Sequence, residues 1–171
     1  KDSTVLANCA VALRNLARHE DSRGLMVEKG AVSELVHLST SEDNRVRGYA
    51  AGALVNLALH EPSGPQIVEG GAVKPLVHLC GKSQDTTMLQ YAAQALVNLS
   101  RHEDSRLQIV REGAVPPLVH LCANCKDQTV LGFAAGALAN LGLDESSVPT
   151  IVDDGAVEVD RRVALERRRE D

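Results

Sequence analysis

Three residues come closest to the spacing of a metal site: His120, Cys122 and Cys125, in the order His-x-Cys-x-x-Cys. Histidine nitrogens and cysteine thiolates are the usual ligands of zinc, but a structural zinc ion needs four of them. No second pair with suitable spacing occurs in the sequence, and 42 residues earlier the last of the three positions holds Ser83. We therefore interpret these cysteines as thiols of the apolar core, and we expect neither a metal ion nor another cofactor.

A second grouping, His-Glu-Asp-Ser, occurs at 19–22 and again at 102–105. Between them, residues 60–63 read His-Glu-Pro-Ser, and residues 144–147 read Asp-Glu-Ser-Ser. Serine and aspartate at such regular places are typical of turns and helix caps. The sequence also contains no phosphate-binding loop and no nucleophile elbow. We predict that the protein has no catalytic residues and is not an enzyme.

The elements that must position all these residues repeat along the chain. Gly-Ala-Val recurs every 41 or 42 residues, beginning at Gly30, Gly71, Gly113 and Gly155, and an Asn-Leu pair recurs with the same period. Such self-similarity is typical of stacked helical repeats, in which each unit buries its apolar face against its neighbours. The period predicts a partial repeat at 1–18, repeats at 19–60, 61–102 and 103–144, the start of another at 145–157, and a charged tail or polar cap at 158–171.

Within the repeat 103–144, apolar periodicity predicts three helices, over 106–111, 116–122 and 129–141, with a loop at 123–128. Gly113 should end the first helix, because glycine readily adopts the left-handed conformation that closes a helix. The third helices are rich in small residues. A glycine inside a helix costs about 1 kcal/mol relative to alanine, so Gly52 and Gly136 indicate close packing or room for a ligand.

The pattern Ile-Val-x-x-Gly-Ala-Val-x-x-Leu-Val-x-Leu, followed by Ala-Ala-Gly-Ala-Leu-x-Asn-Leu, resembles the armadillo repeat over residues 2–157. The resemblance implies an all-α fold, a right-handed α-solenoid of three-helix repeats whose third helices line a concave face. This sequence pattern is more similar to the repeats of beta-catenin, plakophilin, vacuole-anchoring and plant ubiquitin-ligase arrays than to those of importin-alpha. Importin-alpha carries Trp four residues before the Asn, which argues against binding of a classical nuclear-localisation signal here. The corresponding positions are Val11, Gly52, Gln94 and Gly136.

The recurrent asparagines are the first candidates for ligand contact. In the resembled family this residue commonly hydrogen-bonds the main chain of an extended ligand, and an amide can both donate and accept. The alternative is that each amide caps or bonds its own array. The asparagine row consists of Asn15, Asn56, Asn98 and Asn140.

A row seven residues earlier contains every aromatic side chain of the protein. Positions seven apart lie on the same face of a helix, about 10 Å from each other. These rings would favour apolar or basic ligand side chains, or else they cover the edge of the alanine-rich core. The row consists of Asn8, Tyr49, Tyr91 and Phe133.

Two arginines complete the predicted peptide-binding set. Arg14 precedes the first asparagine of the row and could pair with an acidic ligand group. Arg45 stands eleven residues before Asn56, near the start of its helix. The positions that match Arg14 in later repeats are apolar, so no basic stripe is expected along the groove.

Composition narrows the partners. The chain is 44 % hydrophobic with no Trp, one Phe and two Tyr, so the core must be aliphatic. A net charge of −5 argues against a nucleic-acid partner, and the absence of a long apolar run argues against membrane insertion. The four cysteines, all in apolar helical patterns, indicate reduced, buried thiols and a cytoplasmic or nuclear location.

The sequence therefore predicts a protein–protein interaction scaffold that binds an extended peptide segment along a concave groove. One alternative is a structural or assembly module of a larger multidomain protein. Another is the substrate-recruiting array of a ubiquitin ligase, which flanking sequence would decide. The array shows no polar capping repeat at its start, so self-association through uncapped ends is also an expectation.

Overall fold

The computed structural model describes residues 2–155, and within them the chain is helical and contains no strand. The predicted tail at 158–171 lies outside the described residues, and residues 148–155 are helical. The bounded elements are α1 (Ser3–Ala17), α2 (Glu20–Glu28), α3 (Ala31–Ser39), α4 (Asn44–Leu57), η1 (Glu61–Ser63), α5 (Gly64–Glu69), α6 (Val73–Lys82), α7 (Thr86–Ser100), α8 (Glu103–Arg111), α9 (Val115–Asn124) and α10 (Gln128–Leu141).

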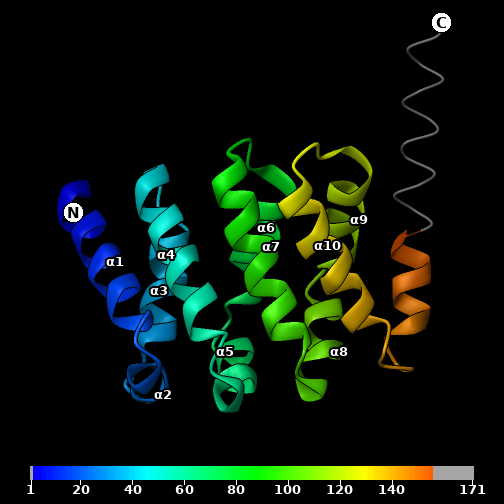
Figure 1. Ribbon diagram of the computed structural model, residues 1–171, viewed down its shortest axis with the longest axis horizontal. Coiled ribbons are helices and arrows are strands. Elements are labelled where there is room, and N and C mark those ends of the chain that lie inside the picture. Colours follow the sequence, from blue (N-terminus) through cyan, green and yellow to red (C-terminus); the bar gives the residue numbers. More distant parts are fainter. Residues whose placement is uncertain (1, 156–171) are drawn as a thin grey trace, which may run out of the picture.

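The helices stack into a row of similar layers (Figure 1). Helices α1, α4, α7 and α10 pack side by side, each against the next, and form one face of the row. Behind them α3 packs on α4, α6 on α7 and α9 on α10, while α2, α5 and α8 lie at the lower end of the view. This arrangement is an α-solenoid, which confirms the all-α fold class.

An aspartate is the N-cap residue of each of the helices α1, α4, α7 and α10. The carboxylate of each accepts a hydrogen bond from a backbone N–H group of the first turn. The first turn of a helix leaves such donors without an intrahelical partner, so this cap stabilises the helix start. The capping residues are Asp2, Asp43, Asp85 and Asp127.

Glycines close the first helix of each repeat, as predicted for Gly113. The φ angles of Gly30, Gly71 and Gly113 are 82°, 83° and 80°, in the left-handed region. A side chain at any of these positions would be strained, because L-residues rarely adopt this conformation.

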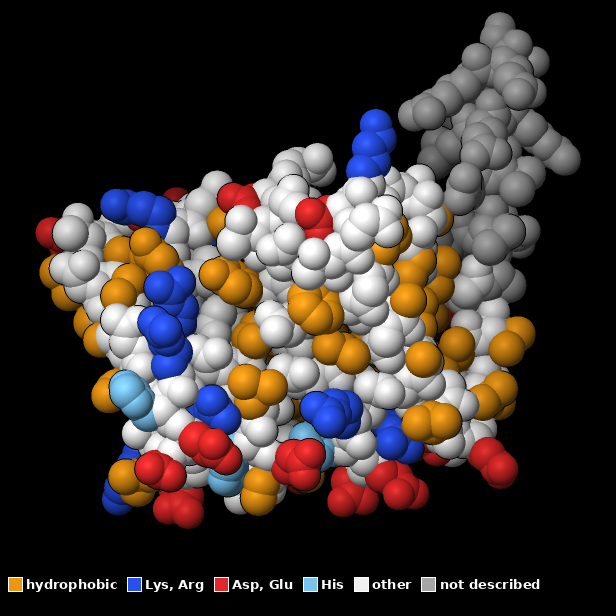
Figure 2. Space-filling view, in the orientation of Figure 1, with side chains coloured by type: hydrophobic (Ala, Val, Ile, Leu, Met, Phe, Trp, Pro, Cys, Tyr) orange, Lys and Arg blue, Asp and Glu red, His pale blue; other side chains and the backbone are white. Residues whose placement is uncertain are grey.

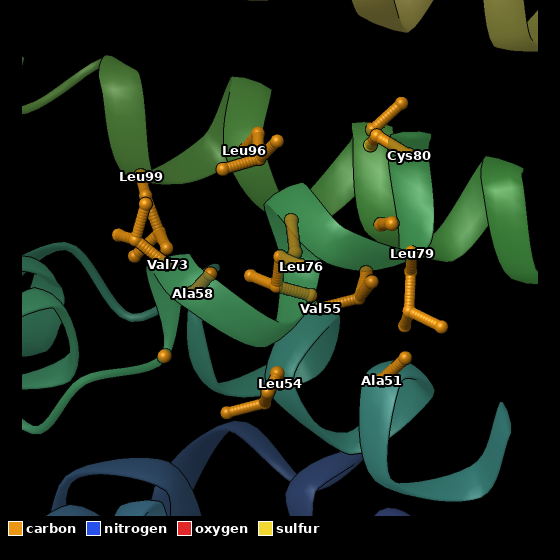
Figure 3. Packing of buried hydrophobic residues seen from close by; sticks show 14 of the residues in the cluster. Ala51, Leu54, Val55, Ala58, Val73, Leu76, Leu79, Cys80, Leu96 and Leu99 are labelled. Carbon is orange, nitrogen blue, oxygen red and sulfur yellow. The ribbon is translucent and has the colours of Figure 1, made fainter. Parts of the chain in front are cut away.

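The core is a continuous aliphatic layer that runs through the repeats. Figure 3 shows part of it, where Leu54 of α4, Leu76 of α6 and Leu96 of α7 are completely buried. Gly136 serves close packing, because a Cβ there would lie 3.1 Å from Val97 Cγ2 in the neighbouring helix α7.

Two expectations about the helices of the repeat 103–144 were wrong, and the repeat before it also departs from this pattern. Helix α8 begins at Glu103 rather than near Arg106, because Glu103 and Asp104 in its first turn interact favourably with the helix dipole. Helix α9 starts at Val115 and continues to Asn124, which shortens the loop before α10. The first helix of the repeat 61–102 is split into η1 and α5, with a proline near the start of each.

The prediction that all four cysteines are buried was also wrong. Cys9 is exposed, Cys122 and Cys125 are half-buried, and only Cys80 is fully buried. Burial raises the pKa of Cys80 to about 12, so this thiol stays neutral. Burial also raises the pKa of Cys122.

Candidate functional site

The face formed by α1, α4, α7 and α10, here called the front face, carries most of the predicted binding residues. Figure 2 shows a column of basic side chains over α1 and α4, while much of the rest of this face is apolar or uncharged. Acidic side chains gather at the lower edge, where α2, α5 and α8 lie.

A first hollow of about 320 Å³ opens on this face between α1, α4 and α7. It is polar and basic, because arginines from α1 and its C-cap meet amides and an aromatic ring from the next two front helices. No carboxylate contributes to its lining. The lining residues are Arg14, Arg18, Gly52, Val55, Asn56, Leu59, Tyr91 and Gln94.

A second hollow of about 270 Å³ lies beside the first and shares Arg14 and Tyr91 with it. It adds a second aromatic ring, an arginine and one carboxylate, so its charge is mixed. Its lining residues are Arg14, Asn44, Arg45, Gly48, Tyr49, Asp85, Thr87, Met88 and Tyr91. The two hollows together form a groove across three front helices.

Arg14 is held at the centre of this groove. Its guanidinium carbon lies 4.9 Å from the centroid of the Tyr49 ring, a distance at which the cation and the ring attract each other. Gly52 makes room for this arrangement, since a Cβ there would lie 3.1 Å from Arg14 Cδ and 3.5 Å from Tyr91 Cε2. The absent side chain at Gly52 therefore lets α1 and α7 contribute to one site.

Arg45 is already paired within the protein. Its guanidinium lies 2.8 Å from a carboxylate oxygen of Asp43, the cap of α4. The Asp43 carboxylate also accepts a hydrogen bond from Ser3 in α1. The hydrogen bond from Arg45 is the largest cause that lowers the pKa of Asp43, and the ion pair raises the pKa of Arg45.

The asparagines of the predicted row differ in their bonding. The Nδ2 group of Asn56 donates to the Arg14 carbonyl at 3.3 Å, and Nδ2 of Asn140 donates to the Val97 carbonyl at 3.3 Å and to Ser100 Oγ at 3.1 Å. These bonds tie neighbouring front helices together, as the array-bonding alternative requires. Asn98 is only 8 % exposed, and its buried Nδ2 has no hydrogen-bond partner. Asn15 is exposed.

The structure brings together part of the predicted set. Asn56 lines the first hollow, Arg45 and Tyr49 line the second, and Arg14 and Tyr91 line both. The remaining predicted residues line neither hollow: Asn15, Asn98, Asn140 and Phe133. Peptide contact by any of these residues stays a prediction.

The predicted set lacks two polar side chains of the first hollow, Arg18 and Gln94. Gln94 stands four residues before Asn98 and hence on the same helical face, a signal that could have identified it. Arg18 lies one residue beyond the end of α1, as its C-cap, where helical periodicity gives no guidance.

The His-x-Cys-x-x-Cys segment does not assemble a metal centre in the part of the chain that the structure describes. Residues 2–155 contain no group of three or more His, Cys, Asp or Glu side chains placed to hold a metal ion. The Nδ2 group of Asn124 donates to the His120 carbonyl at 3.0 Å. Among the described residues, no helix is long and apolar enough to cross a membrane.

The sequence matches the Armadillo/beta-catenin-like repeat family over residues 19–59, 65–101 and 102–142. Among solved structures, two engineered proteins are 33 % and 37 % identical to the chain, cover 92 % and 95 % of it, and superpose with TM-scores of 0.81 and 0.83. A designed armadillo repeat protein in complex with the peptide (KR)4 is 24 % identical over 91 % of the chain, with a TM-score of 0.80. The chain spans 66 %, 40 % and 66 % of these three proteins. No curated protein gives a significant sequence match.

Proposed function

The chain belongs to the Armadillo/beta-catenin-like repeat family, and we propose that it is an interaction scaffold that binds an extended peptide segment of a partner protein along its front face. The single observation that supports this most strongly is the groove made by the two adjoining hollows, which share Arg14 and Tyr91. Armadillo repeats act in general as binding scaffolds, and the proposal assigns the chain no reaction.

The groove has the chemistry that a peptide in extended conformation needs. Amide groups of Asn56 and Gln94 line it, and an amide can pair with both the N–H and the C=O groups of a peptide main chain. Neighbouring helices stand about 10 Å apart and an extended chain advances about 3.3 Å per residue. Each repeat would therefore meet roughly every third ligand residue.

The side chains of the ligand should differ along the groove. Arg14 and Arg18 line the first hollow without an accompanying carboxylate, which favours an acidic ligand side chain there. The rings of Tyr49 and Tyr91 line the second hollow, whose charge is mixed, and they favour an apolar ligand side chain there. A designed armadillo repeat protein forms a complex with the peptide (KR)4, which supports peptide binding by this fold.

The proposal is tested by selecting short peptides on the wild-type protein and measuring their affinity for Arg18→Glu. Arg18 is exposed, so the substitution should spare the fold. The matched control is Arg101→Glu, at the same C-cap position of α7, which lines neither hollow. We expect peptides with an acidic residue to lose affinity in the first variant and keep it in the second. Unchanged binding by Arg18→Glu, or equal loss in both variants, would contradict the assignment.

A second candidate function is an assembly module, because large apolar side chains are exposed on the first helix and along residues 143–152. Val5 and Leu16 of α1 are 57 % and 52 % exposed, and Leu143 and Val152 are 68 % and 60 % exposed. Isolated apolar residues are common on surfaces, but patches of them often mark contacts between proteins. Sedimentation over a range of protein concentrations tests this candidate, since stacking predicts a mass that rises with concentration.

A further inference from the structure

We propose a second docking site on the layer behind the front face, between α3 and α6, which takes a partner-protein segment that carries an apolar side chain next to a carboxylate. This site is independent of the front groove. It is a hollow of about 640 Å³, which is within the range of about 300–1,000 Å³ typical of ligand sites. Its lining residues are Val36, Ser39, Thr40, Arg47, Gly71, Lys74, Pro75 and His78.

The charges of the lining indicate the class of occupant. Arg47, Lys74 and His78 contribute basic groups and no Asp or Glu lines the hollow, although the chain as a whole has a net charge of −5. A local basic cluster on an acidic protein selects for a carboxylate by charge complementarity. Val36 and Pro75 provide the apolar surface that would cover the neighbouring side chain of the occupant.

Arg47 is a cation without a carboxylate partner among the described residues. One terminal nitrogen donates to the Ser41 carbonyl at 2.9 Å and the other donates to Asn44 Oδ1. The Nε group is buried and has no hydrogen-bond partner. The guanidinium is thus fixed in place by neutral groups, and its charge is left uncompensated beside the hollow.

The next junction along the array shows that the fold alone does not produce this hollow. Between α6 and α9, Gly81 stands where Thr40 stands between α3 and α6, and Leu89 stands where Arg47 does. A Cβ on Gly81 would lie 3.7 Å from Pro117 Cβ, an ordinary van der Waals distance. A hollow that includes Gly81 and Leu89 has a volume of about 290 Å³, and no Lys or Arg lines it.

Two substitutions separate the charge of the site from its shape. Lys74→Glu reverses an exposed charge of the lining and should leave the fold intact. Thr40→Trp places a large ring at the exposed C-cap of α3, where it would fill the hollow. Lys29→Glu is the matched control, because Lys29 is an exposed lysine at the C-cap of α2 and does not line the hollow.

The probes are short peptides in which an apolar residue precedes Asp or Glu, together with the same peptides carrying Asn or Gln in place of the acid. Binding is measured to the wild type, to these three variants and to Arg18→Glu, with circular dichroism melts as a check of folding. We expect a set of acidic peptides that bind about tenfold or more weakly to Lys74→Glu and to Thr40→Trp, and that bind Lys29→Glu and Arg18→Glu as tightly as the wild type.

The outcomes distinguish this site from the front groove. If every peptide that binds loses affinity only in Arg18→Glu, the peptides bind the front groove and the second site has no ligand. That result would overturn the proposal of a second docking site and leave the front groove intact. Equal binding of the acidic and amide peptides, or of the wild type and Lys74→Glu, would also overturn it. Dodecanoate is tested as well. If it binds the wild type but not Lys74→Glu or Thr40→Trp, and no peptide binds, then the occupant is a small amphiphile and the partner-segment assignment is wrong.

Discussion

The unpartnered Asn98 amide leads to the sharpest prediction about the array. Asn98 and Asn140 occupy the same position in consecutive repeats, yet only Asn140 bonds the preceding front helix, through the Val97 carbonyl and Ser100 Oγ. We expect that leucine, a side chain of similar size, lowers stability at position 140 but leaves it unchanged or raises it at position 98.

The size of each change in the free energy of unfolding follows from the hydrogen bonds that the two asparagine side chains make. A net hydrogen bond contributes about 0.5–1.5 kcal/mol, and a buried polar group without a partner costs about 1–3 kcal/mol. Asn140→Leu removes two bonds and should lower the free energy of unfolding by about 1–3 kcal/mol. Asn98→Leu removes an unpaired buried donor, so that free energy should stay unchanged or rise by about 1 kcal/mol.

Urea unfolding followed by far-ultraviolet circular dichroism measures both effects as midpoints at a common slope. Peptide affinity measured on the same proteins separates stability from function, because an amide kept at a cost to stability should matter for binding. If Asn98→Leu destabilises the protein as much as Asn140→Leu, the amide has a structural partner and the reasoning fails.

Four further predictions concern individual residues. Gly64→Ala should destabilise the protein by about 1–3 kcal/mol in urea unfolding, because the new Cβ would lie 2.2 Å from the ring of His102, and His102→Ala in the same chain should restore part of the loss. Burial is the main cause that lowers the pKa of His102, so its neutral form favours the folded state. Its contribution should be present above the ordinary histidine pKa of 6.5 and be lost as the pH falls through the lowered value, and melting temperatures of wild type and His102→Gln should converge in that direction. Maleimide should label exposed Cys9 in the native protein and buried Cys80 only after unfolding, as read by mass spectrometry. Arg106→Ala should lower the urea midpoint by an amount equivalent to about 1–3 kcal/mol, since the side chain donates at 3.0 Å and 3.2 Å to carbonyls at the end of α7.

The sequence predicts the repeat and its helices well, because both depend on local periodicity. The 41- or 42-residue spacing sets the stack, and the glycine before each second helix takes the left-handed conformation that its place in the pattern requires. The helix starts were less predictable. An acidic first turn extends α8 to Glu103, and prolines divide the first helix of the repeat 61–102 into η1 and α5.

The candidate site was less predictable than the fold because it depends on contacts between repeats. Periodicity places Asn56 and Asn98 at equivalent positions, but only the spacing between front helices decides that Asn56 reaches the Arg14 carbonyl while Asn98 reaches nothing. The pairing of Arg45 with the cap of α4 follows from a two-residue separation, which the spacing along the rows does not reveal. Cys9 is exposed although its helical pattern predicts burial, because periodicity does not show which face a neighbouring repeat covers.

The second docking site lies where the repeat 19–60 meets the repeat 61–102, and the front groove, which begins at α1, crosses the same junction. Sequence differences at this junction help to explain both sites. The first and third of the complete repeats carry Arg23 and Arg106, which bond the carboxyl ends of α1 and α7, whereas Gly64 occupies this position in the middle repeat. The Asn98 amide adds no bond to α4, and α4 and α7 contact each other less extensively than the other pairs of neighbouring front helices do. Behind them, Thr40 stands at the position that Gly81 occupies at the next junction. With fewer bonds holding it closed, this junction opens on both faces, and so the binding surfaces follow from the differences among the repeats rather than from the repeat itself.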